Sequence, residues 1–295
     1  MKASENAYAK INLFLDVTGK RADGFHDIKS IMQTVSLADM IELEAKPNEK
    51  TDVSLSLTIS PELSMLGLTP DSLGAPEDNL ACRAARLYLE RASISACVEI
   101  RLEKRIPVAA GLGGGSADAA AVLRALNSIY SAFTQSELLD ISLELGSDVP
   151  FCLVCGTALC SGRGEKMVNL SYTPDLNVVI AIGKSKISTV KAYKALDDAF
   201  SDFDGTAGDH REFSSLSDGI ENSVYNIFEY SSLPELKEVE HIKELLRTLG
   251  ATATLMSGSG PSVFGIFGTK NEADSASKSL RENGIFAVST KTVRI

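Results

Sequence analysis

The sequence contains no tryptophan, only three histidines and five cysteines among its 295 residues. An odd number of cysteines without an apparent export signal argues against a disulfide framework, so we expect reduced thiols. The histidines at 26, 210 and 241 lack metal-ligand spacing, and no second pair accompanies the C-x-x-C of Cys152 and Cys155. We therefore interpret these two cysteines as small buried hydrophobic residues and expect no metal site built from protein side chains alone.

Long apolar runs and basic runs are also missing. No stretch approaches the roughly 20 apolar residues of a membrane span. Polar residues interrupt the first 16 residues, so we expect no signal peptide there. The formal net charge of −10 argues against wrapping of nucleic acid or binding to an anionic membrane. We expect a cytoplasmic protein with neither kind of partner, in which any phosphate is bound by local donors.

Hydrophobic residues make up 44% of the chain and charged residues 23%, which is ample for a buried core. A chain of this length favours two domains, which we expect at 1–160 and 161–295. Because predicted strands and helices are mixed rather than strictly alternating, the expected class is α+β. The expected strands are 7–17, 38–46, 52–60, 96–104, 177–182, two within 251–268, and 285–295. The expected helices are 80–92, the segment after Ser116, 134–146, 188–200, 233–250 (with Pro234 in its first turn) and 272–284, and 201–219 is a predicted polar surface loop.

Four glycines, Gly111, Gly113, Gly114 and Gly115, fall within five residues at the start of a predicted helix. Helix N-termini carry unpaired N–H groups and partial positive charge, and glycine lets an anion approach them closely. Ser116 adds a hydroxyl that can donate to an anion, cap the helix or bind a metal. The alternative is a glycine turn that only permits close helix packing. For four glycines beside a helix start, we favour a phosphate site.

Two common phosphate signatures do not fit this loop. The motif G-x-x-x-x-G-K-[ST] needs a lysine after its last glycine, but Gly115 is followed by Ser116 and Ala117. The dinucleotide motif G-x-G-x-x-G, counted from Gly111, would need its third glycine at Ser116, so a Rossmann dehydrogenase is disfavoured. Asp118 would bring negative charge into the first helical turn, and we expect its side chain to point away from a phosphate.

The segment PVAAGLGGGSADAAA, beginning at Pro107, is similar to the motif P-x-x-x-G-L-G-S-S-A-A of the GHMP small-molecule kinases. The segment MSGSGPSVFGIF, at 256–267, resembles the C-terminal motif G-x-G-P-x-x-F of that family. The opening strand AYAKINLFLD and the segment LGSDVPFC, at 145–152, resemble members that act on a cytidine diphosphate-linked methylerythritol in non-mevalonate isoprenoid biosynthesis. These motifs lie at both ends and in the middle, so the resemblance extends over the whole chain.

The resemblance implies a two-domain α+β fold whose active site lies in the cleft between the domains. It implies ATP as phosphate donor, Mg²⁺ bound with the nucleotide, and transfer of the γ-phosphate to the 2-hydroxyl of the methylerythritol moiety. Ser116 is the best protein candidate for a metal contact, and no carboxylate partner is evident. The residues implied in triphosphate binding are Pro107, Val108, Ala109, Ala110, Gly111, Leu112, Gly113, Gly114, Gly115, Ser116 and Ala117.

Lys10 and Asp148 are the candidate catalytic residues. Asp148 precedes Val149 and Pro150, and its spacing alone would suggest a turn or N-cap aspartate. In the matching motif, the family uses this aspartate as general base. Lys10 lies in the middle of a predicted strand, where a lysine is unusual and solvation is the ordinary explanation. The resemblance implies Lys10 beside Asp148, where its charge would keep the carboxylate ionised and stabilise developing charge.

Four further residues are candidates for binding the alcohol substrate. Asn12 shares a strand face with Lys10 and would orient the hydroxyls of the substrate. Phe25 and His26 would contact cytosine by stacking and hydrogen bonding, although His26 alone would suggest a surface turn. The family more often has tyrosine at the position of Phe25, so the ring remains and the phenol hydroxyl is lost. Tyr193 would form a second aromatic wall or pack in the core of its helix.

Two other functions remain open at this point. A GHMP kinase for a mevalonate-type or homoserine-type alcohol would share the glycine motifs, but Lys10, Asn12 and the GFH segment favour a substrate bearing cytidine. A non-catalytic nucleotide-binding protein on the same fold would keep the glycines and lose the base, whereas this chain has both Lys10 and Asp148. The partner is therefore expected to be a small molecule, and the protein a monomer or a weak homodimer.

Overall fold

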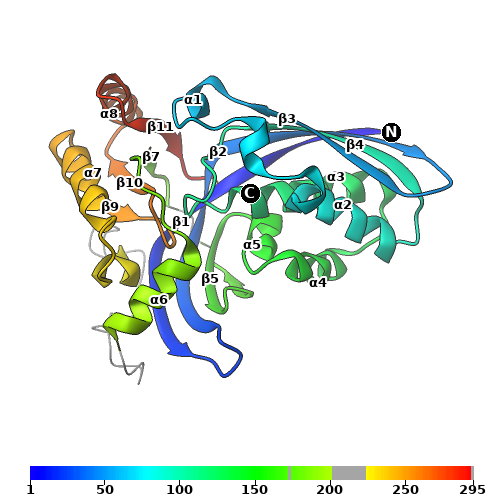
Figure 1. Cartoon of the computed structure of the whole chain (residues 1–295), viewed down its shortest axis with the longest axis horizontal. Helices are drawn as coiled ribbons and strands as arrows, with labels where there is room; N and C mark the ends of the chain where they lie inside the picture. Colours follow the sequence, from blue (N-terminus) through cyan, green and yellow to red (C-terminus); the bar gives the residue numbers. More distant parts are fainter. Residues whose placement is uncertain (172–173, 201–223, 294–295) are drawn as a thin grey trace. The chain divides into compact units, whose positions relative to one another are not determined.

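The computed structural model describes residues 1–171, 174–200 and 224–293. The chain forms two compact units, each built from segments that are separate in the sequence (Figure 1). Unit 1 comprises Met1–Ala9, Leu37–Val108 and Gly113–Cys155, and unit 2 comprises Lys10–Ser36, Ala109–Leu112 and Gly156–Ile295. The expected division at residue 160 followed the order of the chain, whereas these units interleave because two long strands contribute to both.

The strands of unit 1 are hydrogen-bonded in the order β3-β4-β2-β1. They are β1 (Lys2–Lys20), β2 (His26–Pro47), β3 (Asp52–Ile59) and β4 (Ala96–Lys104), of which β1 and β2 continue into unit 2. β3 and β4 are parallel, with Leu55 opposite Ile100, and β2 runs antiparallel to β4. Alternate residues of β4 are buried, as the period-two pattern predicted. The strands expected at 7–17 and 38–46 are the inner parts of the longer β1 and β2.

Figure 1 shows the longer helices of unit 1 on one side of its strands. Asn79 caps α2 by accepting from the backbone N–H of Ala81, and Thr134 with Glu137 forms the capping box predicted for α4. α3 is buried along much of its length, and its many alanines let neighbouring helices approach closely. The helices of unit 1 are α1 (Pro61–Ser64), η1 (Pro70–Leu73), η2 (Pro76–Asp78), α2 (Leu80–Arg91), α3 (Gly114–Tyr130), α4 (Gln135–Leu145) and α5 (Val149–Val154).

Unit 2 contains a second, antiparallel sheet in the order β11-β7-β10-β9. Helices α7 and α8 pack against this sheet, while β5 pairs with β2 and the short β8 pairs with β1. The strands are β5 (Thr157–Gly162), β6 (Lys166–Asn169), β7 (Asn177–Ile182), β8 (Tyr225–Asn226), β9 (Ala253–Met256), β10 (Val263–Phe267) and β11 (Phe286–Lys291). The helices are α6 (Thr189–Ala199), η5 (Ile227–Tyr230), α7 (Leu236–Thr248) and α8 (Lys270–Glu282).

The α+β class is confirmed, and two helix starts differ from the prediction. α3 begins at Gly114, so two of the four glycines lie in its first turn, directly after Gly113, whose left-handed φ of +69° ends the loop. α7 begins at Leu236 with Glu235 as its N-cap, so Pro234 precedes the first turn. The loop predicted at 201–219 lies outside the described residues.

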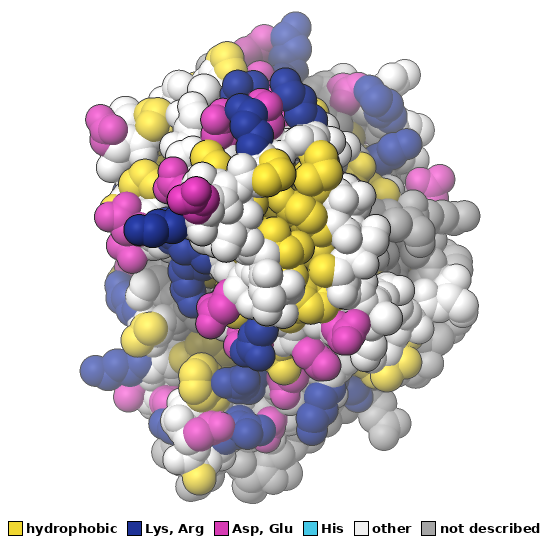
Figure 2. Space-filling view, turned by 90° about the vertical axis from the view of Figure 1, so that its right-hand side faces the viewer, with side chains coloured by type: hydrophobic (Ala, Val, Ile, Leu, Met, Phe, Trp, Pro, Cys, Tyr) yellow, Lys and Arg dark blue, Asp and Glu magenta, His cyan; other side chains and the backbone are white. Residues whose placement is uncertain are grey.

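The molecular face shown in Figure 2 has a central group of hydrophobic side chains surrounded by polar and charged ones. Acidic and basic side chains are interspersed on this face, so the net charge of −10 is not concentrated there as one acidic patch. Among the residues that the structure describes, no helix has both the length and the apolar character needed to span a membrane.

Candidate nucleotide and substrate site

The glycine-rich loop ends in a helix start that no side chain caps. Gly113 is the N-cap of α3 with φ +69°, and no side-chain hydrogen bond is made at this cap. The first-turn N–H groups of a helix have no partner within the helix, so here they are available to an anion. Gly115 is exposed, and a Cβ added there would contact only Leu80 Cδ1, at 3.4 Å. This part of the loop fits the phosphates of a nucleotide.

Gly111 has a different role, because it packs against the second glycine motif. A Cβ added at Gly111 would lie 2.0 Å from the backbone oxygen of Ser257, and its φ is +76°. The Ser257 hydroxyl donates to the backbone oxygen of Gly111 at 3.0 Å, and the Ser262 hydroxyl donates to that of Ala110. The interpretation of close backbone packing is thus confirmed at Gly111, and binding of an anion by the amides from Gly113 onward stays a prediction.

Lys10 lies on β1 and is buried, with 5% of its surface exposed, which rules out the solvated lysine considered from the sequence. Its Nζ donates to Asn12 Oδ1 at 2.8 Å, and Asn12 Nδ2 donates to Ser30 Oγ at 2.8 Å. The Ser30 hydroxyl in turn donates to the backbone oxygen of Phe14. The shared face predicted for Lys10 and Asn12 is thus present. The backbone N–H of Lys10 also donates to the Leu112 oxygen at 3.0 Å, which joins β1 to the glycine-rich loop.

Asp148 belongs to unit 1 and stands at the N-cap position of α5, directly before Val149 and Pro150. Its side chain is half-buried and makes no cap hydrogen bond. An aspartate at a helix N-cap normally accepts from the N–H of the second or third helical residue. The carboxylate of Asp148 is therefore not used for the capping role that its position suggested.

His26 is the first residue of β2 and is buried, in contrast to the surface turn considered from the sequence. Its ring stacks on Tyr193, with the centroids 4.7 Å apart, and its Nε2 lies 2.7 Å from Asp197 Oδ1. Tyr193 and Asp197 are four residues apart on α6 and so lie on one helix face. Burial acts to raise the pKa of Asp197, but hydrogen bonds from Lys20 and His26 outweigh it, and the net result is a lowered pKa. An ionised Asp197 favours a proton on the facing nitrogen of His26.

Phe25 is 53% exposed, and the guanidinium of Arg163 lies 4.9 Å from the centre of its ring. The structure thus gives the two neighbouring candidates different surroundings. His26 is held by Tyr193 and Asp197, whereas the Phe25 ring keeps much of its surface open to solvent. An exposed ring beside a cation is available for stacking on a planar base.

A buried ionic cluster lies beneath the start of α3 and was not predicted from the sequence. Lys104 donates to Asp39 and, at 2.7 Å, to Asp118 Oδ2, and all three side chains are at most 5% exposed. Asp39 also accepts from the backbone N–H groups of Arg105 and Ile106. Asp118 therefore points into the interior of unit 1, in agreement with the expectation that it would turn away from a phosphate.

Burial and the neighbouring charges together determine the pKa values of Asp118 and Lys104 in this cluster. Burial raises the pKa of Asp118 to about 8; the Lys104 ammonium opposes this change, and the Asp39 carboxylate adds to it. Burial acts to lower the pKa of Lys104, but the two carboxylates outweigh it and the pKa is raised. Lys104 is thus a firmly charged group close to the first turn of α3. A Cβ added at Gly114 would lie 3.5 Å from Lys104 Nζ.

Metal-binding residues do not gather in the described part of the chain, where no group of three or more His, Cys, Asp or Glu side chains could hold an ion. Cys152 and Cys155 are both buried, in agreement with their interpretation as small buried hydrophobic residues. Ser116 lies in the first turn of α3 and is partly exposed, so its hydroxyl could contact a nucleotide-bound Mg²⁺, and this contact stays a prediction.

The two-unit α+β fold and the uncapped helix start behind a glycine-rich loop define a class of small-molecule phosphotransferase. Residues 79–156 match the GHMP kinases N terminal domain, and residues 192–285 match the GHMP kinases C terminal domain. The chain belongs to the GHMP kinase family.

Comparison with individual proteins shows which members of this family the chain is similar to. The 4-diphosphocytidyl-2-C-methyl-D-erythritol kinase of Caldicellulosiruptor bescii is 40% identical over 280 residues, covering 93% of each chain. The protein of the same name in Bacillus subtilis is 40% identical over 275 residues, covering 90% of this chain and 88% of its own. A crystal structure of 4-(cytidine 5'-diphospho)-2C-methyl-D-erythritol kinase aligns with a TM-score of 0.81 and 31% identity, covering 99% of this chain and 100% of its own. Homoserine kinase from Cytophaga hutchinsonii shares the fold, with a TM-score of 0.69 and 20% identity over 99% of this chain and 94% of its own.

Proposed function

We propose that this protein transfers the γ-phosphate of ATP to the 2-hydroxyl of 4-diphosphocytidyl-2-C-methyl-D-erythritol, a step in non-mevalonate isoprenoid precursor biosynthesis. Relatives that carry this activity in their names are 40% identical over 90% or more of the chain. The structural observation that carries the proposal is the hydrogen bond from the Lys10 N–H to the Leu112 oxygen. It ties the strand bearing a buried lysine directly to the glycine-rich loop.

In this proposal, residues 107–117 bind the triphosphate. The support is the N-cap at Gly113, a glycine with no side chain to cap the first-turn amides of α3, and the exposed backbone at Gly115. The positive end of α3 adds an attraction of about 0.3–1 kcal/mol for a negative charge. This arrangement explains how a protein with a net charge of −10 binds a polyanion: its donors are local backbone groups.

Lys10 and Asp148 are proposed to carry the chemistry. Asp148 would accept the proton of the substrate hydroxyl as its oxygen attacks the γ-phosphorus, and Lys10 would stabilise the charge that develops on the transferred group. One such electrostatic contact is commonly worth about 3 kcal/mol of activation free energy. The support is that Lys10 is buried and held by Asn12, and that Asp148 is half-buried at the start of α5. Mg²⁺ bound with ATP would neutralise the phosphates, with the Ser116 hydroxyl as its protein contact.

The alcohol substrate is proposed to contact Asn12 through its hydroxyls and His26 through its cytosine. The stacked pair of His26 and Tyr193, fixed by Asp197, gives a base-recognition site with a defined proton position. Phe25 would stack on the cytosine, since its ring is largely exposed. We further propose that the protein acts in the cytoplasm as a monomer or weak homodimer, which sedimentation of the purified protein would test.

The deciding experiment is phosphorus NMR of a reaction with ATP and the cytidyl alcohol. The expected result is ADP together with a new phosphomonoester signal coupled to the methylerythritol carbon C2. Mevalonate and homoserine serve as competing acceptors in parallel reactions. Phosphate transfer to either of them but not to the cytidyl alcohol would replace the proposed substrate. ATP binding without transfer to any acceptor would identify a non-catalytic nucleotide-binding protein.

A further inference from the structure

The turn between β9 and β10, residues 257–262, packs against the backbone of Ala110 and Gly111 in the glycine-rich loop. Its Ser257 and Ser262 hydroxyls donate to the backbone oxygens of Gly111 and Ala110. A Cβ at Gly258 would lie 3.1 Å from the oxygen of Gly111, so the two backbones touch here without intervening side chains. Any displacement of this turn is therefore passed directly to residues 109–112, because no flexible side chain can absorb it.

The turn is itself held by Asn226 from the edge of the sheet. β9 is an edge strand, whose outward backbone groups would otherwise have no partner in the sheet. Asn226 Nδ2 donates to the backbone oxygens of Met256 and Gly258, both at 2.8 Å, and Asn226 Oδ1 accepts from the N–H of Phe228. Asn226 is 1% exposed and uses both of its amide protons on this turn.

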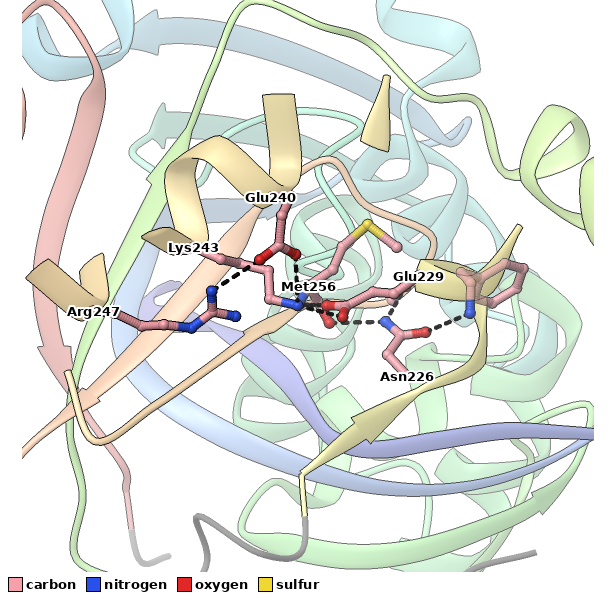
Figure 3. A network of polar contacts seen from close by, with 8 residues as sticks. Asn226, Glu229, Glu240, Lys243, Arg247 and Met256 are labelled. Atoms are coloured by element: carbon pink, nitrogen blue, oxygen red, sulfur yellow. Dashed lines mark hydrogen bonds and ion pairs between the residues drawn. The ribbon is translucent and has the colours of Figure 1, made fainter. Parts of the chain in front are cut away.

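Glu229 binds the other backbone group of the same residue, Met256. Its Oε1 accepts from the Met256 N–H at 2.6 Å, and its Oε2 accepts from Lys243 Nζ at 2.5 Å. Figure 3 shows these contacts continuing along α7, where Lys243 contacts Glu240, and Glu240 accepts from Arg247. Lys243 has 9% of its side chain exposed, whereas Arg247, at the outer end of these contacts, has 47% exposed. The C=O of Met256 is thus bound by the buried Asn226, and its N–H by the partly buried Glu229.

The same residues connect the turn with the strand of Lys10. Asn226 lies on β8, which pairs with β1 through Leu15, and the Lys10 N–H is bonded to Leu112. The chain of contacts therefore closes on itself: β1 to β8, β8 to the turn, the turn to residues 109–112, and these back to β1. All of its members belong to unit 2.

We propose that Asn226 and Glu229 are positioning residues for ATP, which fix residues 109–112 against the strand of Lys10; this inference rests on the proposed kinase function. Neither side chain needs to touch the nucleotide. Instead, they fix the position of residues 109–112, whose backbone is proposed to contact ATP. A shift of about 1 Å in such backbone groups can cost roughly 100-fold in rate or affinity. A purely structural role would instead reduce the amount of folded enzyme and leave its Michaelis constants unchanged.

The test uses Asn226→Asp and Glu229→Gln in the full chain, with KM for ATP, KM for the cytidyl alcohol and kcat measured separately. Asn226→Asp keeps the acceptor for Phe228 and loses both donors to the turn. Glu229→Gln keeps an acceptor for Met256 and loses the ion pair with Lys243. We expect KM for ATP to rise about 10- to 100-fold for Asn226→Asp and less for Glu229→Gln, with KM for the alcohol within about twofold of wild type.

A second measurement follows the turn itself. Amide hydrogen exchange at Ser257 and Gly260, whose N–H groups are bonded within the turn, should accelerate at least tenfold in Asn226→Asp. Arg247→Ala, at the exposed end of the contacts in Figure 3, is the control and should match wild type in all these measurements. A wild-type protein that transfers no phosphate would refute the proposed function. An active wild type, with variants that change neither KM for ATP nor the exchange of the turn, would refute only the positioning role.

Discussion

Gly111 and Gly113 are only two residues apart and both have left-handed φ angles, yet their surroundings differ. Gly111 faces the backbone of Ser257 and has no room for a side chain. Gly113 is the N-cap of α3 and has no side chain that could cap its first amides. One loop therefore contains a packing glycine, Gly111, and a glycine proposed to serve binding, Gly113, and the two roles can be separated by substitution.

Gly111→Ala should destabilise the protein. Its Cβ would overlap the Ser257 oxygen, and the left-handed backbone adds strain, so we expect a loss of roughly 2–5 kcal/mol in the free energy of unfolding. Urea denaturation measures this loss. Gly19→Ala is the matched control, because a Cβ at Gly19 meets no atom within 4 Å, and it should change stability by less than about 0.5 kcal/mol. Equal stabilities for the two variants would contradict the packing role of Gly111.

Asp148→Asn should separate binding from chemistry. The amide keeps the size of the side chain and cannot accept the hydroxyl proton, so we expect kcat to fall by about 10²- to 10⁴-fold. The Kd for ATP, measured by calorimetry, should stay within about twofold of wild type. The exposed Asp140→Asn on α4 is the control for the same chemical change and should be fully active. Turnover near wild type in Asp148→Asn would remove this residue from the role of base.

At the scale of elements, α3 is the part of the fold on which most of the proposed site depends. Its N-terminal turn carries the glycines, and the Lys104 cluster lies beneath it. Lys104 and Asp39 come from β4 and β2, so two strands fix the helix start through one ammonium group. Removing that ammonium would leave the buried Asp39 carboxylate without a counter-charge, which typically costs about 3–5 kcal/mol.

The pKa of Asp118 gives this cluster a defined dependence on pH. A carboxyl whose pKa is raised from 3.8 to about 8 on folding binds its proton more tightly in the folded state. Its contribution to stability is therefore complete below pH 4 and is lost as the pH rises towards 8, by up to about 1.4 kcal/mol per pH unit. Asp118→Asn should remove this loss. Urea unfolding of both proteins between pH 5 and 9 measures the difference, and parallel stability curves would show that Asp118 is already ionised.

Local chemistry in the sequence predicted most elements, since capping residues such as Asn79 and Thr134 act within one helical turn. It also predicted the shared face of Lys10 and Asn12, which are two residues apart on one strand. The contacts it missed join distant residues, such as Asp197 with His26 or Asn226 with Met256. No periodicity encodes such pairs. For Asp197 a signal existed, because it lies one helical turn after Tyr193.

At the scale of the whole molecule, the interleaved units make a prediction about fragments. The fragment 156–295 contains the complete sheet of β7, β9, β10 and β11, but it lacks β1 and β2, with which β8 and β5 pair. In this fragment alone, the amides of β5 that face β2 should exchange rapidly, whereas those that face β6 keep their partner strand, and addition of 1–155 should slow the former. The amides of β10 are the internal control, because both neighbours of β10 are present. Slow exchange of the β5 amides that face β2 in the isolated fragment would contradict this prediction.

The interleaving of the two units also limits which changes gene recombination can produce in such a protein during evolution. The chain passes from one unit to the other after Ala9, Ser36, Val108, Leu112 and Cys155. Exchanging the whole of unit 2 with that of a relative would therefore need five crossovers within one gene, and a single recombination event would leave strands with mismatched neighbours. A new acceptor specificity on this scaffold is accordingly easier to reach by substitutions in place than by shuffling of gene segments.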